Sequence, residues 1–218
     1  PIGISYESGV SAQLKSAVML AGLNSYGNTS ITEVQRSRDH TENILFKNSK
    51  VIKVKNRKRK IITIFGKRNL NSFKIEVPND PSSAAFFTAL TLLNKKSSLK
   101  IKNVGLNPTR TGFYQILKKQ GAKINFKNLN KNNNELRGDI LIKSCNLKPI
   151  QASKFYYTNM TDEYPILFVI AALTKGVSSF KGIGDLVNKE SDRIKEMQKI
   201  LDQIDVKSKF FRNELKIF

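Results

Sequence analysis

The sequence predicts an α/β fold made of repeated βαβαββ units. The first observation is an apolar, Ala-rich run of helical length that follows a short polar segment at three places in the chain. The second is that strand-like stretches and a second, more polar helix start follow each of these runs. A repeat of about 70–80 residues that mixes parallel crossovers with closing hairpins is typical of an α/β protein and is too long for an ordinary solenoid.

Each apolar run begins directly after residues that favour a helix start. Ser and Asp are common helix N-caps, and Pro suits the first helical turn. We therefore expect these first helices to be capped and buried, and the charged second helices to be half exposed. The polar segments are SAQ at 11–13, DPSS at 80–83 and TDEYP at 161–165, and the apolar runs are 14–23, 84–93 and 166–173.

Short strand-like stretches complete each repeat. One follows each first helix, two close the repeat, and a further strand is expected before the first helix. The second helices begin within 37–42, 108–112 and 189–193, each with an arginine near its start. The predicted strands are 29–33, 51–54 and 60–65 in the first repeat, 98–102, 123–126 and 139–143 in the second, and 178–182, 206–210 and 214–218 in the third.

A break in the pattern follows the first repeat at VPND, residues 77–80. Pro and Asn in such a segment mark a turn or a linker. We predict a domain boundary here, with residues 1–76 in one domain and residues 77–218 in another. A chain of 218 residues is long enough for one or two domains with a sizeable core.

The charge of the chain is strongly basic, with 38 Lys and Arg against 17 Asp and Glu. Such an excess is the usual footprint of a nucleic-acid-binding protein. The abundance of Lys together with Asn and Ile also fits a genome-wide bias toward A/T-rich codons. The densest basic run, KVKNRKRK at 53–60, contains no aromatic residue and favours a hairpin with a solvated face. An anion-attracting surface on an enzyme with phosphorylated substrates lies between these interpretations.

Other site classes are excluded by composition. No apolar run approaches the ~20 residues of a membrane-spanning helix. A single cysteine, Cys145, excludes a disulfide scaffold and a cysteine-ligated zinc site, and His40 is the only histidine. We expect Cys145 to be a small core residue of a strand, and His40 to be structural.

Six motifs in this order resemble the 5-enolpyruvylshikimate-3-phosphate synthase family over essentially the whole chain. The residue Lys15 and the segment RDHTE are most similar to the class II branch. The resemblance implies two domains, each an inside-out α/β barrel of three βαβαββ units. Residues 1–76 would then end one domain, and residues 77–218 would supply two repeats of the other. The motifs are SAQLKSAVMLAGL at 11–23, SRDHTE at 37–42, VPNDPSSAAF at 77–86, NPTRTGF at 107–113, TDEYPIL at 161–167 and NKESDR at 188–193.

The same resemblance implies an activity. These enzymes transfer the enolpyruvyl group of phosphoenolpyruvate to the 5-hydroxyl of shikimate 3-phosphate by addition and elimination. Phosphate is released, and the product leads to chorismate and the aromatic amino acids. The family implies no metal or organic cofactor, no nucleic-acid or membrane partner, a cytoplasmic location and a monomer when the protein is complete.

Binding residues follow from the motifs by resemblance. Ser11, the amide of Ala12 and Arg38 would hold the phosphate of shikimate 3-phosphate, and Gln13 would lie against the shikimate ring. An arginine suits this role because its guanidinium binds phosphate through two parallel hydrogen bonds. Arg110 is expected to anchor a second-helix start and is given no substrate role.

Reacting residues follow in the same way. Asp162 would act as the general base on the 5-hydroxyl, and Lys189 would approach the same hydroxyl. Glu190 would protonate the methylene carbon and later remove a proton from the methyl group, while Arg193 would bind phosphoenolpyruvate. Addition of an alcohol across an enol ether needs such a base and such an acid. Asp185, Val187 and Asn188 depart from the family pattern near this motif.

Alternatives remain open at this stage. The family's phosphoenolpyruvate ligands from its N-terminal and C-terminal segments have no counterpart here. We therefore expect the chain to be an internal segment that does not catalyse the reaction alone. A UDP-N-acetylglucosamine enolpyruvyl transferase shares the fold, but it typically uses a loop cysteine. A basic nucleic-acid-binding module fits the charge but lacks an RNA-binding signature motif.

Overall fold

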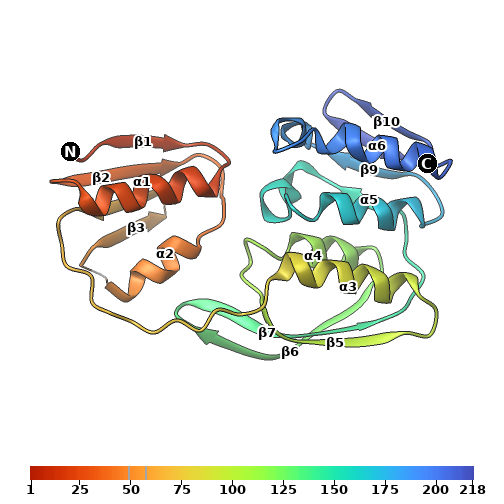
Figure 1. The fold of residues 1–218 in the computed structure, drawn as a ribbon, viewed down its shortest axis with the longest axis horizontal. Helices are drawn as coiled ribbons and strands as arrows, with labels where there is room; N and C mark the ends of the chain where they lie inside the picture. The colour runs from red at the N-terminus through yellow and green to blue at the C-terminus, as the bar shows by residue number, and fades with distance from the viewer. Residues whose placement is uncertain (49, 57) are drawn as a thin grey trace. The chain divides into compact units, whose positions relative to one another are not determined.

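The computed structural model describes the whole chain except residues 49 and 57, so Arg57 of the predicted basic hairpin lies outside the described residues. The chain forms two compact units, which are described separately (Figure 1). Unit 1 comprises residues 1–77 and 131–136, and unit 2 comprises residues 78–130 and 137–218.

Unit 1 contains one four-stranded sheet with the strand order β1-β2-β4-β3. The strands β1 and β2 are parallel and are joined through α1, whereas β4 pairs antiparallel with both β2 and β3. A parallel pair needs such a crossover, and an antiparallel pair needs only a hairpin. The elements are β1 (Ser5–Ser8), α1 (Ala12–Asn24), β2 (Asn28–Glu33), α2 (His40–Leu45), η1 (Phe46–Asn48), β3 (Ile52–Asn56) and β4 (Lys60–Phe65).

The core of unit 1 lies between α1 and one face of this sheet. Met19 of α1 is fully buried, as are Ile31 of β2 and the alternating residues Ile62 and Ile64 of β4. The alternation follows from the two-residue period of a strand. The segment 131–136 belongs to this unit because Glu135 accepts hydrogen bonds from His40 Nδ1 and Asn43 Nδ2, both at 2.9 Å.

The last repeat, in unit 2, has the same strand order as unit 1, β8-β9-β11-β10. Again the leading pair β8 and β9 is parallel, and β11 pairs antiparallel with its neighbours. The predicted repeat is therefore confirmed in its topology. The elements are β8 (Gln151–Ala152), η2 (Lys154–Asn159), α5 (Tyr164–Ala172), β9 (Ser178–Lys181), η3 (Gly184–Asn188), α6 (Arg193–Gln203), β10 (Ser208–Phe211) and β11 (Glu214–Ile217).

The middle repeat departs from the prediction at its leading strand. Its sheet has the order β5-β7-β6, and the strand expected before α3 is reduced to one parallel bridge between Asn79 and Val104. Pro78 and Pro81 flank this bridge and have no N–H to extend a ladder. The elements are α3 (Pro81–Leu93), β5 (Ser98–Gly105), α4 (Gly112–Lys119), β6 (Lys123–Asn132) and β7 (Glu135–Lys143).

Two of the three predicted caps are confirmed. The Ser11 side chain accepts the N–H of Leu14 at 3.3 Å, and the Asp80 side chain accepts the N–H of Ser83 at 2.8 Å. The third helix, α5, begins after Glu163, whose side chain makes no capping bond. The predicted side-chain cap of α5 was wrong, because Asp162, the polar residue before Glu163, pairs with Arg193 instead.

The predicted burial of the first helices was correct for α5 and wrong for α1 and α3. Leu14 and Leu20 of α1 are more than half exposed, and so are Phe86, Phe87 and Leu90 of α3. Each of these two helices covers its sheet with one face only. Among the described residues, no helix combines the length and the apolar character that crossing a membrane requires.

The predicted place of Cys145 was also wrong. This residue lies beyond the end of β7 in an irregular segment and is half-buried. The strand ends at Lys143, so Cys145 is not a core residue of the sheet.

An aromatic cluster forms the core of the last repeat. Phe168 of α5 and Phe180 of β9 meet edge to face with their ring centroids 4.9 Å apart, and Tyr164 packs beside them. All three side chains are fully buried. Edge-to-face contacts add to the free energy gained from burial of the rings.

Replacing Phe168 with Ala should lower the free energy of unfolding by about 3–5 kcal/mol, because the deletion leaves a cavity in this core. Urea denaturation followed by circular dichroism measures the change. Phe155→Ala is the matched control, since Phe155 is 82% exposed and its loss should cost less than about 0.5 kcal/mol. Equal effects of the two substitutions would contradict the described core.

Candidate functional site

The first group of predicted site residues lies at the start of α1 and in the loop before α2. Ser11 is the N-cap of α1, and Ala12 and Gln13 form its first turn. The first backbone N–H groups of a helix lack partners within the helix and attract anions. Arg38 is half-buried in the loop between β2 and α2. Unit 1 thus contains both a helix start and a guanidinium that suit a phosphate group.

A buried charge cluster lies beneath this group. Lys15 of α1 is completely inaccessible to solvent, and its Nζ lies 2.8 Å from Glu33 Oε1 and 2.8 Å from Glu42 Oε1. Lys60 of β4 adds a second ammonium group, 3.0 Å from Glu42 and 3.5 Å from Glu33. Two ammonium groups against two carboxylates leave no net charge, which is what burial of such groups requires.

The cluster also holds the loop that carries Arg38. Glu33 accepts hydrogen bonds from the backbone N–H of Ser37 at 2.9 Å and from its hydroxyl at 2.7 Å. Burial by itself raises the pKa of Glu33, but the hydrogen bonds from Lys15 and Ser37 outweigh it and hold the pKa below its ordinary value. Lys15 and Ser37 therefore connect the first turns of α1 with the residue that precedes Arg38.

This cluster was missed at the sequence level, although one signal was available. Lys15 lies on the same helix face as Met19 and Gly22, at spacings of four and seven residues. A lysine on the buried face of an apolar helix requires a carboxylate partner. The sequence does not say which carboxylate, because the partners are 18 and 27 residues away.

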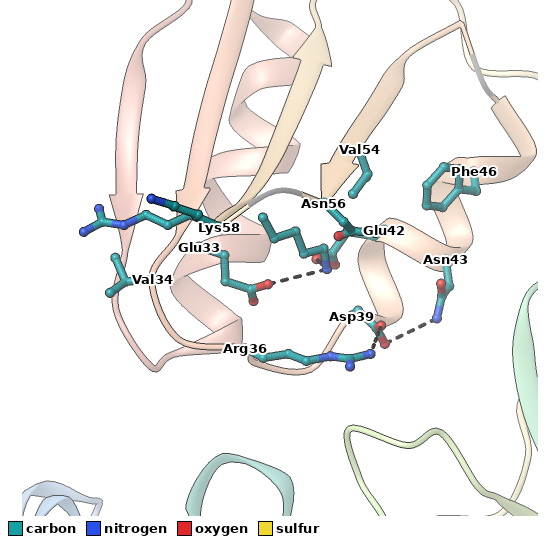
Figure 2. A pocket seen from close by; sticks show the side chains of 12 residues that line it. Glu33, Val34, Arg36, Asp39, Glu42, Asn43, Phe46, Val54, Asn56 and Lys58 are labelled. Carbon is teal, nitrogen blue, oxygen red and sulfur yellow. Dashed lines mark hydrogen bonds and ion pairs between the residues drawn. The ribbon is translucent and has the colours of Figure 1, made fainter. Parts of the chain in front are cut away.

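A pocket of about 450 Å³ opens on the solvent side of the cluster, between α2 and the β3–β4 hairpin (Figure 2). Arg36 faces Asp39 across its mouth at 3.9 Å, and Glu33 and Glu42 point into it from β2 and α2. Ser11, Ala12, Gln13 and Arg38 are not among the residues that line it. The lining of the pocket and the predicted phosphate-binding group therefore share no residue.

The second group of predicted site residues lies where η3 meets α6. Arg193, the first residue of α6, binds two carboxylates at once: Nη2 lies 2.8 Å from Glu190 Oε2, and Nη1 lies 3.2 Å from Asp162 Oδ1. Nη1 also donates to the carbonyl oxygen of Thr161 at 3.3 Å. The fold thus brings together Asp162, Glu190 and Arg193, which the sequence assigned to one reaction.

Lys189 pairs with a different carboxylate, that of Asp185. Its Nζ lies 2.8 Å from Asp185 Oδ2, and the Tyr157 hydroxyl donates to the same carboxylate at 2.6 Å. Burial alone raises the pKa of Asp185, but Lys189 and Tyr157 together lower it below its ordinary value. Asp185, which departs from the family pattern, is thus the residue that positions Lys189.

Glu190 is ionised in this arrangement. Its side chain is 83% exposed. A hydrogen bond from its own backbone N–H and the contact with Arg193 both lower its pKa. A carboxyl group with a lowered pKa is a poor proton donor near neutral pH.

Arg110 was expected to anchor the start of a second helix, but its side chain contacts the start of a first helix, α3, instead. Its Nη2 donates to Ser82 Oγ at 2.6 Å and to Asp80 Oδ1 at 3.1 Å, at the start of α3. Ser82 Oγ in turn donates to Glu163, the neighbour of Asp162, at 2.5 Å. Arg110 therefore anchors the start of α3 and, through Ser82, the start of α5. Within the described residues, no group of three or more His, Cys, Asp or Glu side chains is placed to hold a metal ion.

Replacing Glu33 with Gln should cost about 3–5 kcal/mol at pH 7, because it breaks a buried ion pair. The lowered pKa of Glu33 means that its stabilisation is present above the ordinary value of 4.5 and is lost as the pH falls through the lower folded value. The difference between the parent chain and Glu33→Gln should therefore shrink below about pH 4.5.

Urea midpoints measured between pH 3 and pH 7 test this expectation. The matched control is Glu7→Gln, since the side chain of Glu7 is 64% exposed in its pair with Arg59. A difference between the parent chain and Glu33→Gln that stays constant over this pH range would contradict the ionised state of Glu33.

Comparison with known proteins gives one consistent family. The family described as EPSP synthase (3-phosphoshikimate 1-carboxyvinyltransferase) matches residues 3–217. A 3-phosphoshikimate 1-carboxyvinyltransferase of Thermodesulfovibrio yellowstonii is 43% identical over 217 residues, which are 99% of this chain and 50% of that protein. The corresponding protein of Aquifex aeolicus is 41% identical over 214 residues, 97% of this chain and 50% of its own length.

Solved structures agree with the sequence relatives. The EPSP synthase from Acinetobacter baumannii superposes with a TM-score of 0.86 at 37% identity, covering 99% of this chain and 48% of that one. The enolpyruvyl transferase NikO from Streptomyces tendae has a TM-score of 0.66 at 11% identity, covering 99% and 50%, and shows the fold alone. The chain spans about half the length of the curated relatives it matches. The resemblance seen in the motifs is thereby confirmed, and the chain belongs to the EPSP synthase family.

Proposed function

We propose that this chain is part of a 3-phosphoshikimate 1-carboxyvinyltransferase. The enzyme would transfer the enolpyruvyl group of phosphoenolpyruvate to the 5-hydroxyl of shikimate 3-phosphate and release phosphate. The match to the family over residues 3–217 is the observation that carries this proposal. The contacts of Arg193 with Asp162 and Glu190 support it, because they join a cation with two carboxylates suited to proton transfer.

We assign the phosphate of shikimate 3-phosphate to unit 1. Ser11, the backbone N–H of Ala12 and the guanidinium of Arg38 would bind it, and Gln13 would contact the shikimate ring. The helix dipole of α1 and the charge of Arg38 both favour a dianion at this place. The buried cluster around Lys15 supports this role, since it links the first turns of α1 with the loop of Arg38.

The reaction itself is assigned to residues of unit 2. Asp162 takes the proton of the 5-hydroxyl while the hydroxyl oxygen attacks C2 of phosphoenolpyruvate. Glu190 donates a proton to the methylene carbon. In the second step the bond between C2 and the phosphate oxygen breaks, and the phosphate leaves with the proton that Asp162 had taken. Glu190 removes a proton from the methyl group to restore the double bond. Lys189 approaches the reacting hydroxyl once the lysine ammonium group leaves Asp185. Its positive charge stabilises the negative charge that develops on the hydroxyl oxygen.

The contacts of Arg193 determine that phosphoenolpyruvate binds before Glu190 donates a proton. With Arg193 on Glu190, the lowered pKa keeps this glutamate ionised and unable to donate a proton. Phosphoenolpyruvate is a multiply charged anion and competes for the same guanidinium. When Arg193 turns to the substrate, Glu190 loses its cation and its pKa rises. Binding of phosphoenolpyruvate thus raises the fraction of Glu190 that carries the proton needed in the addition step.

The remaining assignments follow from this function. Both substrates are small anions, so no nucleic-acid or membrane partner is required, and the basic surface serves to attract them. The chemistry needs no metal or organic cofactor, and we assign the complete enzyme to the cytoplasm as a monomer. Residues 1–76 and residues 77–218 would belong to its two domains.

The chain alone should release no phosphate from the two substrates, because relatives twice as long carry this activity. A chimera in which residues 1–218 replace the matching half of the Aquifex aeolicus protein should release phosphate. In the chimera, Asp162→Asn and Glu190→Gln should each lower kcat by about 10²–10⁴. The matched control is Glu196→Gln, an exposed carboxylate of α6 paired with Lys199, which should leave kcat unchanged. A chimera that uses UDP-N-acetylglucosamine in place of shikimate 3-phosphate would contradict the proposal.

Replacing Arg38 with Ala in the chimera should raise KM for shikimate 3-phosphate by about 10–100-fold, since a charge-assisted phosphate contact is lost. The KM for phosphoenolpyruvate should change much less. The neighbouring Arg36→Ala is the control, because Arg36 is exposed and pairs with Asp39. Equal changes for Arg38→Ala and Arg36→Ala would argue against a specific phosphate contact.

A further inference from the structure

A second pocket, of about 850 Å³, lies within unit 2, and none of the predicted site residues lines it. It is formed by the ends of α3 and α5, the turn before β6 and the irregular segment after β7. Its size falls within the range of about 300–1,000 Å³ that is usual for small-molecule sites. It is lined by Leu92, Leu93, Lys95, Lys96, Gly121, Lys123, Ser144, Cys145, Asn146, Leu147, Leu173, Thr174 and Lys175.

The charge of this pocket is of one sign. Four lysines line it, and no carboxylate does. Over the part of the chain that the structure describes, none of the four has an Asp or Glu oxygen within the 4.0 Å of an ion pair. The pocket in Figure 2 differs in this respect, since carboxylates also line it and three of its four cations, Arg36, Arg59 and Lys60, each pair with a carboxylate.

Helix ends alone do not account for these lysines. The helices α3 and α5 end at Leu93 and Ala172, so their C-terminal carbonyl groups lie near the pocket. Each helix end is equivalent to about half a negative charge, so two ends offset about one lysine. The four lysines therefore leave a net positive pocket, which attracts an anion with more than one charge.

Four leucines also line the pocket. Leu92 is buried, Leu93 and Leu147 are half-buried, and Leu173 is 63% exposed. Ser144 lies among the lining residues and its hydroxyl can donate a hydrogen bond, whereas the Thr174 hydroxyl already donates to the carbonyl oxygen of Ile170 at 2.7 Å. A lining that contains both leucines and lysines suits a ligand that combines an apolar ring with charged phosphates.

We propose that this pocket binds a small organic diphosphate, with the chemistry of a nucleoside diphosphate. The lysines would hold the two phosphates, and the leucines would pack against the base. A single phosphate would engage only some of the four lysines, and a nucleoside without phosphate would engage none of them. The site is independent of the proposed transferase reaction, because none of its lining residues belongs to either group of site residues.

Binding of ADP to the 218-residue chain, measured by isothermal titration calorimetry in ~0.1 M salt, tests the proposal. ADP should bind more tightly than both pyrophosphate and adenosine, and raised salt should weaken it. The double variant Lys95→Gln with Lys175→Gln should weaken ADP binding by about tenfold or more. The double variant Lys102→Gln with Lys209→Gln removes the same charge from exposed positions outside the pocket and should leave ADP binding unchanged.

Cys145 provides a second measurement, since it is the only cysteine and lines the pocket. The ratio of its alkylation rates with iodoacetate and with neutral iodoacetamide reports the local potential. Lys95→Gln with Lys175→Gln should lower this ratio by about two- to fourfold, as expected for two charges within a Debye length. ADP should slow the reaction with iodoacetamide in the parent chain.

Several results would overturn the proposal. One is the absence of ADP binding at millimolar concentration. Another is an equal loss of affinity in both double variants, which would indicate attraction by the overall charge alone. A third is a single-stranded oligonucleotide that binds more tightly than ADP and loses affinity in the pocket variant, since this would make the site a nucleic-acid contact.

Discussion

The organisation of unit 1 depends on the complete burial of the Lys15 ammonium group. A lone buried cation is so costly that the chain must supply carboxylates to it, and Glu33 and Glu42 do so from β2 and α2. These contacts fix where β2 ends and where α2 begins relative to α1. The loop of Arg38 is then held by the bonds from Ser37 to Glu33. An internal ion cluster thus determines the position of residues at the surface.

The three repeats have similar topologies and differ at the leading strand. Unit 1 and the last repeat share the strand order in which a parallel pair is extended by a hairpin. The middle repeat loses its leading strand, because Pro78 and Pro81 cannot donate to a ladder. Its first helix starts in the same way as α1, with a side chain that caps the first turn. The helix start is therefore kept where the strand before it is not.

The cations of unit 2 fall into two groups, which differ in whether a carboxylate pairs with them. Around Arg193 and Lys189 each cation already holds a carboxylate, so an anionic ligand must compete for it. In the proposed function, competition of this kind would couple substrate binding to the protonation of Glu190. At the ends of α3 and α5 the lysines have no such partners among the described residues, and the field there is uncompensated. The high net charge of the chain therefore does not act uniformly.

Sequence by itself determined the repeat, the order of helices and strands apart from the leading strand of the middle repeat, two helix caps and the family, because these depend on local periodicity and on short motifs. It also named Asp162, Glu190 and Arg193, whose mutual contacts the fold then provided. Only the tertiary structure decided which carboxylates surround Lys15, which group holds Lys189 and where Cys145 lies. Such contacts depend on where side chains from different elements meet, and no local pattern specifies that when a chain offers many lysines and several carboxylates.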